Sequence, residues 1–225
     1  MGQPREKPRI DSLIVGDRCT GLRPKWAYSH RILVSRIFVA GMIGVWVVSS
    51  PAWHDLSRAL AHAVAALGIA LATVGAFGRL WCSSYIAGNK SNRLVTTGPY
   101  SLCRNPLYFF TFVGGAGVTL TTETGTLPAL FIAAFWLYYP GVIRAEEQSL
   151  QLLHGDAFED YRGRVPGFWP AFSAYQEPER YEISPVLFRR SLCEVGWFIA
   201  AAVAVHFVDD LRTAAVPFTA WMNLY

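Results

Sequence analysis

The sequence predicts an all-α, polytopic integral membrane protein, and three observations support this fold class. The chain of 225 residues is 52% hydrophobic and only 16% charged, whereas soluble proteins carry about 25% charged residues. Its apolar residues gather in windows of about 17–20 residues, the length of helix that crosses a hydrocarbon core. Its Lys and Arg residues are concentrated in alternate loops, as the orientation of membrane helices requires.

The first half of the chain contains three of the five predicted transmembrane helices. The first covers residues 32–49, with Arg36 close enough to the interface for its charge to reach water. The second, residues 59–77, is rich in Ala and Gly, whose small side chains permit close helix packing in lipid. The third, residues 107–121, follows Pro106, which the first turn of a helix tolerates.

The second half contributes the other two helices. A tight loop at 122–126 leads to the fourth span, 127–143, in which Pro140 is expected to cause a kink. The fifth span, 191–208, ends where Asp209 marks a return to water. Three glycines inside the third span are interpreted as helix-packing residues: Gly114, Gly115 and Gly117.

The distribution of positive charge orients these helices. The loops at 51–58, 122–126 and 209–225 hold only two basic residues, Arg58 and Arg212. Nearly all other Lys and Arg residues fall in the segments on the opposite side. Since cytoplasmic loops carry the excess of basic residues, we predict a protein of the inner (plasma) membrane whose functional site faces the cytosol.

Two polar segments flank one apolar hairpin and therefore lie on the same side of the membrane. The first polar segment comprises residues 79–108 and the second polar segment residues 144–170. Basic residues are spread over several loops without a single basic face, so nucleic acid is not a predicted partner. The chain divides into a cytosolic N-terminal tail (1–30), a membrane domain (31–208) and an external C-terminal tail (209–225).

Cysteine and histidine placement predicts neither a disulfide framework nor a metal site. The four cysteines are scattered and form no C-x-x-C pair. The five histidines form no H-E-x-x-H or comparable ligand pair. The first thirty residues lack the short apolar core of a cleavable signal peptide.

The polar segments offer groups suited to binding a small polar molecule. Tyr100 and Tyr108 can stack on a ring and donate a hydrogen bond, and Asn105 can donate and accept. Glu146 and Glu147 lie on neighbouring faces of a helix, so each can address a different group. These carboxylates are also compatible with a merely solvated helix end.

Two sequence motifs resemble a known family. The segment LVTTGPYSLCRNPLY, followed by AEEQSLQLLHGDAFEDYRGRVPGFWP, is similar to the isoprenylcysteine carboxyl methyltransferase and phospholipid methyltransferase family. The resemblance covers residues 93–170, with both halves in the family's order and spacing. It implies an integral membrane methyltransferase that uses S-adenosylmethionine and acts on a lipid or other hydrophobic acceptor.

The resemblance also implies site residues by matching position. Three charged residues fall where the family has groups that serve catalysis at the acceptor: Arg144, Glu146 and Arg164. Nine residues would line the cofactor pocket: Arg93, Leu94, Val95, Tyr100, Asn105, Pro106, Leu107, Tyr108 and Glu147.

The sequence departs from the family pattern in three respects. Asn105 replaces the usual His and cannot act as a base near neutral pH. Phe110 stands where a Gly is common. The chain also continues into a further span after the V-P motif.

Two other functions stay open beside methyl transfer. Membrane sterol reductases, which use a nicotinamide cofactor, are similar in the G-x-x-x-R-x-P-x-Y region but usually lack the Glu-Glu pair. A non-catalytic membrane scaffold that retains the fold is the other alternative. For the methyltransferase, the acceptor atom can belong to a carboxylate, an amine or a thiol.

Overall fold

The computed structural model describes residues 37–47, 58–86, 93–180, 183 and 185–214. Contacts divide the chain into two units, residues 1–43 and 44–225. Of the first unit only the beginning of a short apolar helix, Ile37–Val47, is described, so the fold below is that of the second unit. The predicted N-terminal tail and the end of the predicted C-terminal tail (215–225) lie outside the described residues.

Every regular element of the described second unit is a helix, which confirms the predicted all-α class. Three helices are long and apolar enough to cross a membrane: α2 (Arg58–Ile86), α5 (Thr126–His154) and α7 (Pro185–Ala214). Four are shorter: α3 (Pro99–Leu102), the apolar α4 (Pro106–Leu120), α6 (Asp156–Arg164) and the 3-10 turn η1 (Phe172–Ala174). The protein is a polytopic membrane protein in which α4 and Ile37–Val47 occupy two of the five predicted spans.

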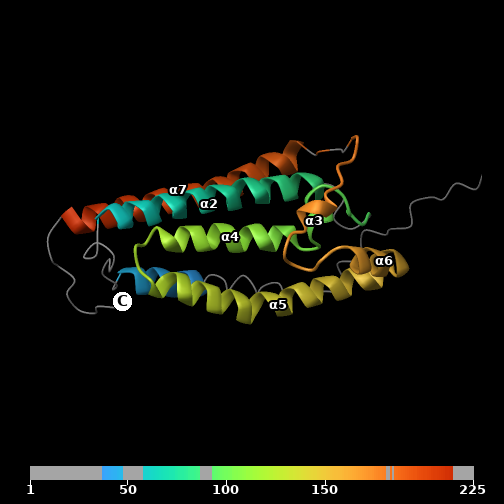
Figure 1. Cartoon of the computed structure of the whole chain (residues 1–225), viewed down its shortest axis with the longest axis horizontal. Coiled ribbons are helices and arrows are strands. Elements are labelled where there is room, and N and C mark those ends of the chain that lie inside the picture. The colour runs from blue at the N-terminus through green and yellow to red at the C-terminus, as the bar shows by residue number, and fades with distance from the viewer. Residues whose placement is uncertain (1–36, 48–57, 87–92, 181–182, 184, 215–225) are drawn as a thin grey trace, which may run out of the picture. The chain divides into compact units, whose positions relative to one another are not determined.

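The membrane helices pack around α4. In Figure 1 α4 lies between α2 and α5, and α7 packs against both α2 and α4. The short helices α3, α6 and η1 gather at one end of this bundle. Both polar segments therefore reach the same end of the membrane helices, as the sequence predicts.

Three helices extend beyond their predicted bounds. α2 continues past residue 77 to Ile86, so the beginning of the first polar segment is helical. Cys82 and Tyr85 in this extension are buried, and their packing maintains the helix beyond the apolar stretch. α7 likewise begins before residue 191 and ends after residue 208, at Ala214.

The extension of α5 decides where the two carboxylates lie. The predicted fourth span ends at residue 143, but the helix contains Pro140 and runs on to His154. The residues after 143 include strong helix formers such as Ala, Glu, Gln and Leu. Gly155 ends the helix with a positive φ of 53°, the left-handed conformation that favours glycine. Glu146 and Glu147 consequently project from a rigid helix rather than from a loop.

Small residues allow α2 and α4 to touch through their backbones. A Cβ at Gly75 would overlap the backbone of Gly114, and one at Gly68 would lie 2.8 Å from the carbonyl oxygen of Gly117. Ala72, between them on α2, is fully buried. Glycine at these positions thus serves helix packing, as predicted for α4.

This close contact makes a quantitative prediction. Gly75→Val should lower the free energy of unfolding by about 1–3 kcal/mol, because the added side chain has no space against α4. The matched control is Gly141→Ala on α5, where no atom lies within 4 Å of the new Cβ. Unfolding of both variants in detergent by titration with dodecyl sulfate checks this expectation. Equal midpoints for the two variants would contradict the proposed packing.

Candidate active site

Hydrogen bonds join the last part of the first polar segment to the end of the second and to the residues that follow it. The N–H of Arg104 donates to the carbonyl of Pro166 (2.8 Å), and the N–H of Ala171 donates to that of Leu102 (2.9 Å). Further along, the hydroxyl of Tyr161 donates to the carbonyl of Tyr100 (2.7 Å). These bonds make one structured cap from segments about sixty residues apart in sequence.

Gly98 turns the first polar segment into this cap. Its φ is +62°, and a Cβ at this position would overlap the ring of Tyr85 from α2. Its N–H donates to the carbonyl of Gln176 (2.7 Å). Only glycine combines this backbone conformation with such a close approach, which explains why the G-P-Y motif begins with glycine.

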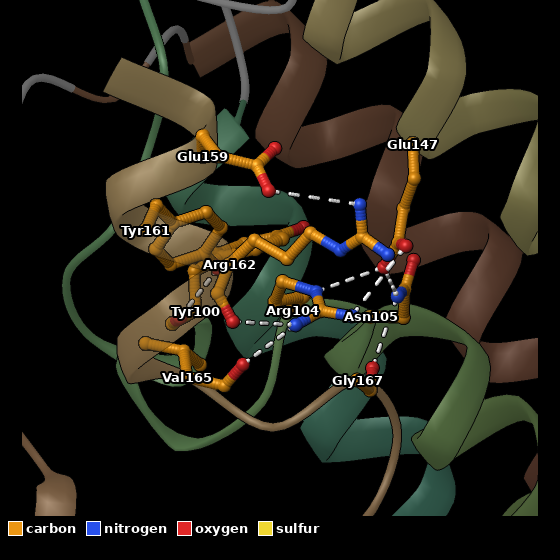
Figure 2. Close-up of polar contacts among 9 residues, drawn as sticks. All are labelled: Tyr100, Arg104, Asn105, Glu147, Glu159, Tyr161, Arg162, Val165 and Gly167. Atoms are coloured by element: carbon orange, nitrogen blue, oxygen red, sulfur yellow. Dashed lines mark hydrogen bonds and ion pairs between the residues drawn. The ribbon is translucent and has the colours of Figure 1, made fainter. Parts of the chain in front are cut away.

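Arg104 holds the two segments together through its guanidinium group, as Figure 2 shows. Its Nε donates to Oε1 of Glu147 at 2.9 Å, forming an ion pair whose side chains are only 15% and 18% exposed. Its Nη1 donates to the carbonyls of Arg162 (3.0 Å) and Val165 (2.8 Å). One arginine thus connects α5 with the end of α6.

Asn105 completes the same network. It is buried, and its amide nitrogen donates to Oε1 of Glu147 (3.0 Å) and to the carbonyl of Gly167 (3.0 Å). A side-chain amide supplies two donors on one nitrogen, which a neutral imidazole does not. The asparagine that replaces the family's usual histidine therefore has a positioning role here, in Figure 2 beside Glu147.

Glu146 binds a different partner from that of Glu147. The hydroxyl of Tyr108 donates to Oε2 of Glu146 at 2.6 Å, across the interface between α4 and α5. The ring of Tyr108 packs edge-on against Tyr139, which stacks on Phe135. The expectation that adjacent carboxylates serve separate groups is confirmed by these contacts.

Two tyrosines in the cap are held in their neutral form. Burial raises the pKa of Tyr100 well above its ordinary value, and the neighbouring Cys82 and Glu146 add to the shift. Burial also raises the pKa of Tyr161, the donor to the backbone of Tyr100. Both phenols can therefore donate hydrogen bonds at any physiological pH.

The remaining site residues predicted from sequence occupy diverse positions. Arg93 is exposed, Leu94 and Val95 are half-buried in a stretch outside any helix, and Pro106 and Leu107 begin α4. Arg144 and Arg164 are exposed. The Nε of Arg164 donates to the carbonyl of Asp160 in its own helix (3.2 Å). Among the described residues, no hydrogen bond joins either arginine to Glu146.

Packing against α2 explains why Phe110 stands where the family pattern commonly has a glycine. A Cβ at Gly78 of α2 would overlap the ring of Phe110. The phenyl ring therefore fills the space opposite a glycine on the neighbouring helix. It also contacts Trp81 edge-on, which extends the aromatic packing toward the cap.

Two residues of the site were not assigned from sequence, Arg104 and Tyr161. Both stand within the quoted motifs, Arg104 directly before Asn105 and Tyr161 in the second polar segment. The signal for Arg104 is a positive charge in a segment whose partner carries five carboxylates, two of them adjacent. The sequence spacing did not indicate which carboxylate it would meet.

Cys103 provides a prediction for alkaline pH. It is fully buried, and burial raises the pKa of its thiol from 9.0 to about 12. The unfolded thiol loses its proton near pH 9 while the folded thiol keeps it, so stability is complete below pH 9 and is lost as pH rises toward 12. We expect a fall of up to about 1.4 kcal/mol per pH unit in this window.

Unfolding at several pH values in wild type and Cys103→Ala measures this contribution. The variant should show a shallower loss of stability between pH 9 and 12, even if its stability at pH 8 is lower. Because Cys103 also adds to the raised pKa of Tyr100 and Tyr161, the difference in slope reports the thiol together with its effect on these two phenols. Parallel slopes would contradict the assignment.

Comparison with known proteins identifies the family. The sequence pattern of the phospholipid methyltransferase family matches residues 56–157. Over 187 residues the chain is 41% identical to the nickel-cobalt-cadmium resistance protein NccN of Alcaligenes xylosoxydans xylosoxydans, covering 82% of this chain and 85% of the relative. The chain belongs to the phospholipid methyltransferase family.

Other relatives extend this family assignment. The chain is 37% identical over 188 residues to the cobalt-zinc-cadmium resistance protein CzcN of Cupriavidus metallidurans, covering 83% of this chain and 85% of the relative. It is 33% identical over 82 residues to the protein-S-isoprenylcysteine O-methyltransferase of Schizosaccharomyces pombe, covering 36% and 35%. No solved structure matches the chain significantly. The family pattern and the isoprenylcysteine O-methyltransferase support a membrane methyltransferase, in agreement with the predicted resemblance.

Proposed function

We propose that the protein transfers a methyl group from S-adenosylmethionine to a lipid or other membrane-partitioned acceptor. The observation that carries this proposal is the joining of the two family motifs by the contacts of Arg104, Asn105 and Glu147. S-adenosylmethionine supplies an activated methyl group on a sulfonium, which becomes a neutral thioether once the methyl is transferred. The residues of the chain then have to bind the cofactor and the acceptor and to orient them toward each other.

The polar groups of the cap are compatible with binding of this cofactor. Glu147 offers a carboxylate that suits a cationic ligand, and Arg104 and Asn105 hold it in place. The stretch at 93–95 has backbone groups outside any helix, which suit the hydrogen-bonding edge of an adenine or the ribose. We assign the cofactor to this region and propose that its pocket is lined by Glu147, Asn105, Pro106 and Leu107.

Alignment is the main catalytic task of the protein in such a transfer. Holding an acceptor and an activated methyl group in near-attack geometry supplies up to about 7–11 kcal/mol of the barrier. We assign Glu146 to the acceptor side, where it orients the acceptor or receives its proton. The exposed Arg144 and Arg164 remain candidates for attracting an acidic head group at the rim.

An aromatic cluster between α4 and α5 suits an apolar acceptor. Phe112, Phe135 and Phe168 pack together, and Trp136 contacts Phe168 with ring centres 5.2 Å apart. Trp136 and Trp169 at its edge are 42% and 60% exposed. Exposed aromatic surface at the membrane boundary binds lipid-like molecules readily, so we place the acceptor's apolar part here.

Calorimetry of the purified protein distinguishes this proposal from its alternatives. We expect S-adenosylhomocysteine to bind and a reduced nicotinamide cofactor not to bind. Binding of the nicotinamide cofactor alone would indicate a reductase, and binding of neither would indicate a scaffold. Mass spectrometry of lipid extracts then identifies the acceptor as a species that gains one methyl group.

The proposal includes the side of the membrane. Because basic residues concentrate on the side of both polar segments, we place this end of the bundle at the cytosolic face of the plasma membrane. Cysteine labelling at Gly2 and Tyr225 should report opposite sides. Labelling of both from one side would overturn this topology.

Two relatives are named for resistance to nickel, cobalt, zinc and cadmium. We propose that the present chain also confers metal resistance, and that it does so by methylating a membrane component. Expression of the wild type in a sensitive host should raise tolerance to cadmium, whereas Glu146→Gln should not. Equal protection by both would separate resistance from methyl transfer.

A further inference from the structure

Arg79 is a charged residue inside a membrane helix. It is the only Asp, Glu, Lys or Arg between Ala59 and Ile86, the stretch of α2 that can cross the membrane. Charged side chains are costly in such helices and commonly mark functional sites. It precedes Ile86 by seven residues, about 10 Å of helix, so it lies near the end where both polar segments meet.

The guanidinium group lies where three helices meet. Its Nη1 donates to the hydroxyl oxygen of Thr111 on α4, and that hydroxyl donates to the carbonyl of Leu107 (2.7 Å). Its central carbon lies 5.3 Å from the ring centre of Phe198 on α7. The Nε atom is buried and has no hydrogen-bond partner.

Among the side chains that the structure describes, none supplies an anion to this positive charge. Within the part of the chain that the structure describes, no carboxylate forms an ion pair with Arg79. It contacts two groups of the kinds that bind cations, the hydroxyl of Thr111 and the ring of Phe198, both from the described part of the chain. An arginine has five N–H donors in a planar fork that matches phosphate and carboxylate groups. A buried donor left without an acceptor is energetically unfavourable.

We propose that Arg79, together with Thr111 and the ring of Phe198, forms a binding site for the acidic head group of an amphiphile. The group is a phosphate or a carboxylate, and it completes the hydrogen bonds of the guanidinium at the junction of α2, α4 and α7. The residue is half-buried, so part of its side chain is accessible. This site stands independently of methyl transfer, because it uses none of the residues assigned to the cofactor.

Native mass spectrometry of the delipidated full-length protein tests the site. The probes are phosphatidylglycerol, palmitate and inorganic phosphate, with phosphatidylcholine of the same acyl chains as the reference. Arg79→Gln should bind at least one acidic probe at least tenfold more weakly, and Arg79→Lys about threefold more weakly, with phosphatidylcholine unchanged. The control Arg190→Gln, an exposed arginine at the start of α7, should stay within twofold of wild type.

The probes distinguish the sources of the anion. A loss confined to phosphatidylglycerol assigns the site to a membrane lipid, a loss of palmitate assigns it to a carboxylate amphiphile, and a loss of inorganic phosphate alone assigns it to a free anion and overturns the amphiphile. Each measurement is paired with thermal unfolding in the same detergent, so that a folding defect is recognised.

Three further results would overturn the proposal. All acidic probes could bind Arg79→Gln as they bind wild type. Phosphatidylcholine could be lost in parallel with them, which would make Arg79 a packing residue only. Finally, Glu194 lies one helical turn before Phe198 in the sequence of α7. A tenfold gain of phosphatidylglycerol affinity in Glu194→Gln would show that the chain supplies its own counter-charge.

Discussion

Glu146→Gln is expected to lower methyl transfer about 100-fold while leaving the affinity for S-adenosylhomocysteine within about threefold of wild type. The carboxylate is held by the hydroxyl of Tyr108 at 2.6 Å, and the amide that replaces it cannot accept a proton. Positioned acids and bases typically contribute 10²–10⁴-fold to a rate. Turnover is followed by formation of S-adenosylhomocysteine in proteoliposomes, and affinity by calorimetry.

Tyr108→Phe is the matched control for this carboxylate. It removes the hydrogen bond to Glu146 but keeps the ring that packs against Tyr139. We expect a smaller loss of turnover and little change in cofactor binding, whereas Tyr108→Ala should weaken cofactor binding as well. A Glu146→Gln protein with normal turnover would remove this residue from catalysis. A loss of binding alone would place it at the cofactor.

Glu147→Gln should instead weaken S-adenosylhomocysteine binding at least tenfold and destabilise the cap. The carboxylate accepts from both Arg104 and Asn105, and its loss leaves a largely buried guanidinium unneutralised. Hydrogen bonds to charged groups contribute about 1.5–3 kcal/mol each. Arg104→Gln should cost more than Glu147→Gln, because Arg104 also binds the carbonyls of Arg162 and Val165.

A double-mutant cycle measures the interaction energy between Arg104 and Glu147 separately from their other contacts. Arg104→Gln and Glu147→Gln together should cost less than the sum of the single variants, with a coupling of about 0.5–3 kcal/mol. The control is Arg162→Gln, whose ion pair with Glu159 is long and more than half exposed, and which should change stability by no more than about 0.5 kcal/mol. Additive effects of Arg104 and Glu147 would contradict a functional ion pair.

Much of the fold follows from the sequence, for physical reasons that particular residues illustrate. Apolar windows and small residues predict helices that cross the membrane and pack closely, and Gly75 and Gly114 do so through their backbones. The end of α5 was not predictable from hydropathy. Residues 144–154 are polar but remain helical, because a helix can continue beyond the bilayer until a residue such as Gly155 stops it.

The site was partly predictable. The motifs predict that the two polar segments meet, since a single hairpin separates them, and the hydrogen bonds between them show that they do. The identity of each partner depends on the angle at which α4 and α5 cross, which no sequence spacing encodes. For that reason the bond between Arg104 and Glu147 and the environment of Arg79 emerge only from the structure.

The most direct test of the central claim follows the methyl group itself. Purified protein in proteoliposomes made from native lipid extract is incubated with S-adenosylmethionine labelled with ¹³C in its methyl group. We expect one membrane-soluble species to gain a single labelled methyl, with one S-adenosylhomocysteine formed per methyl transferred, and Glu146→Gln to lower both about 100-fold. Binding of S-adenosylhomocysteine without any labelled lipid-soluble product, in wild type as in Glu146→Gln, would contradict the account.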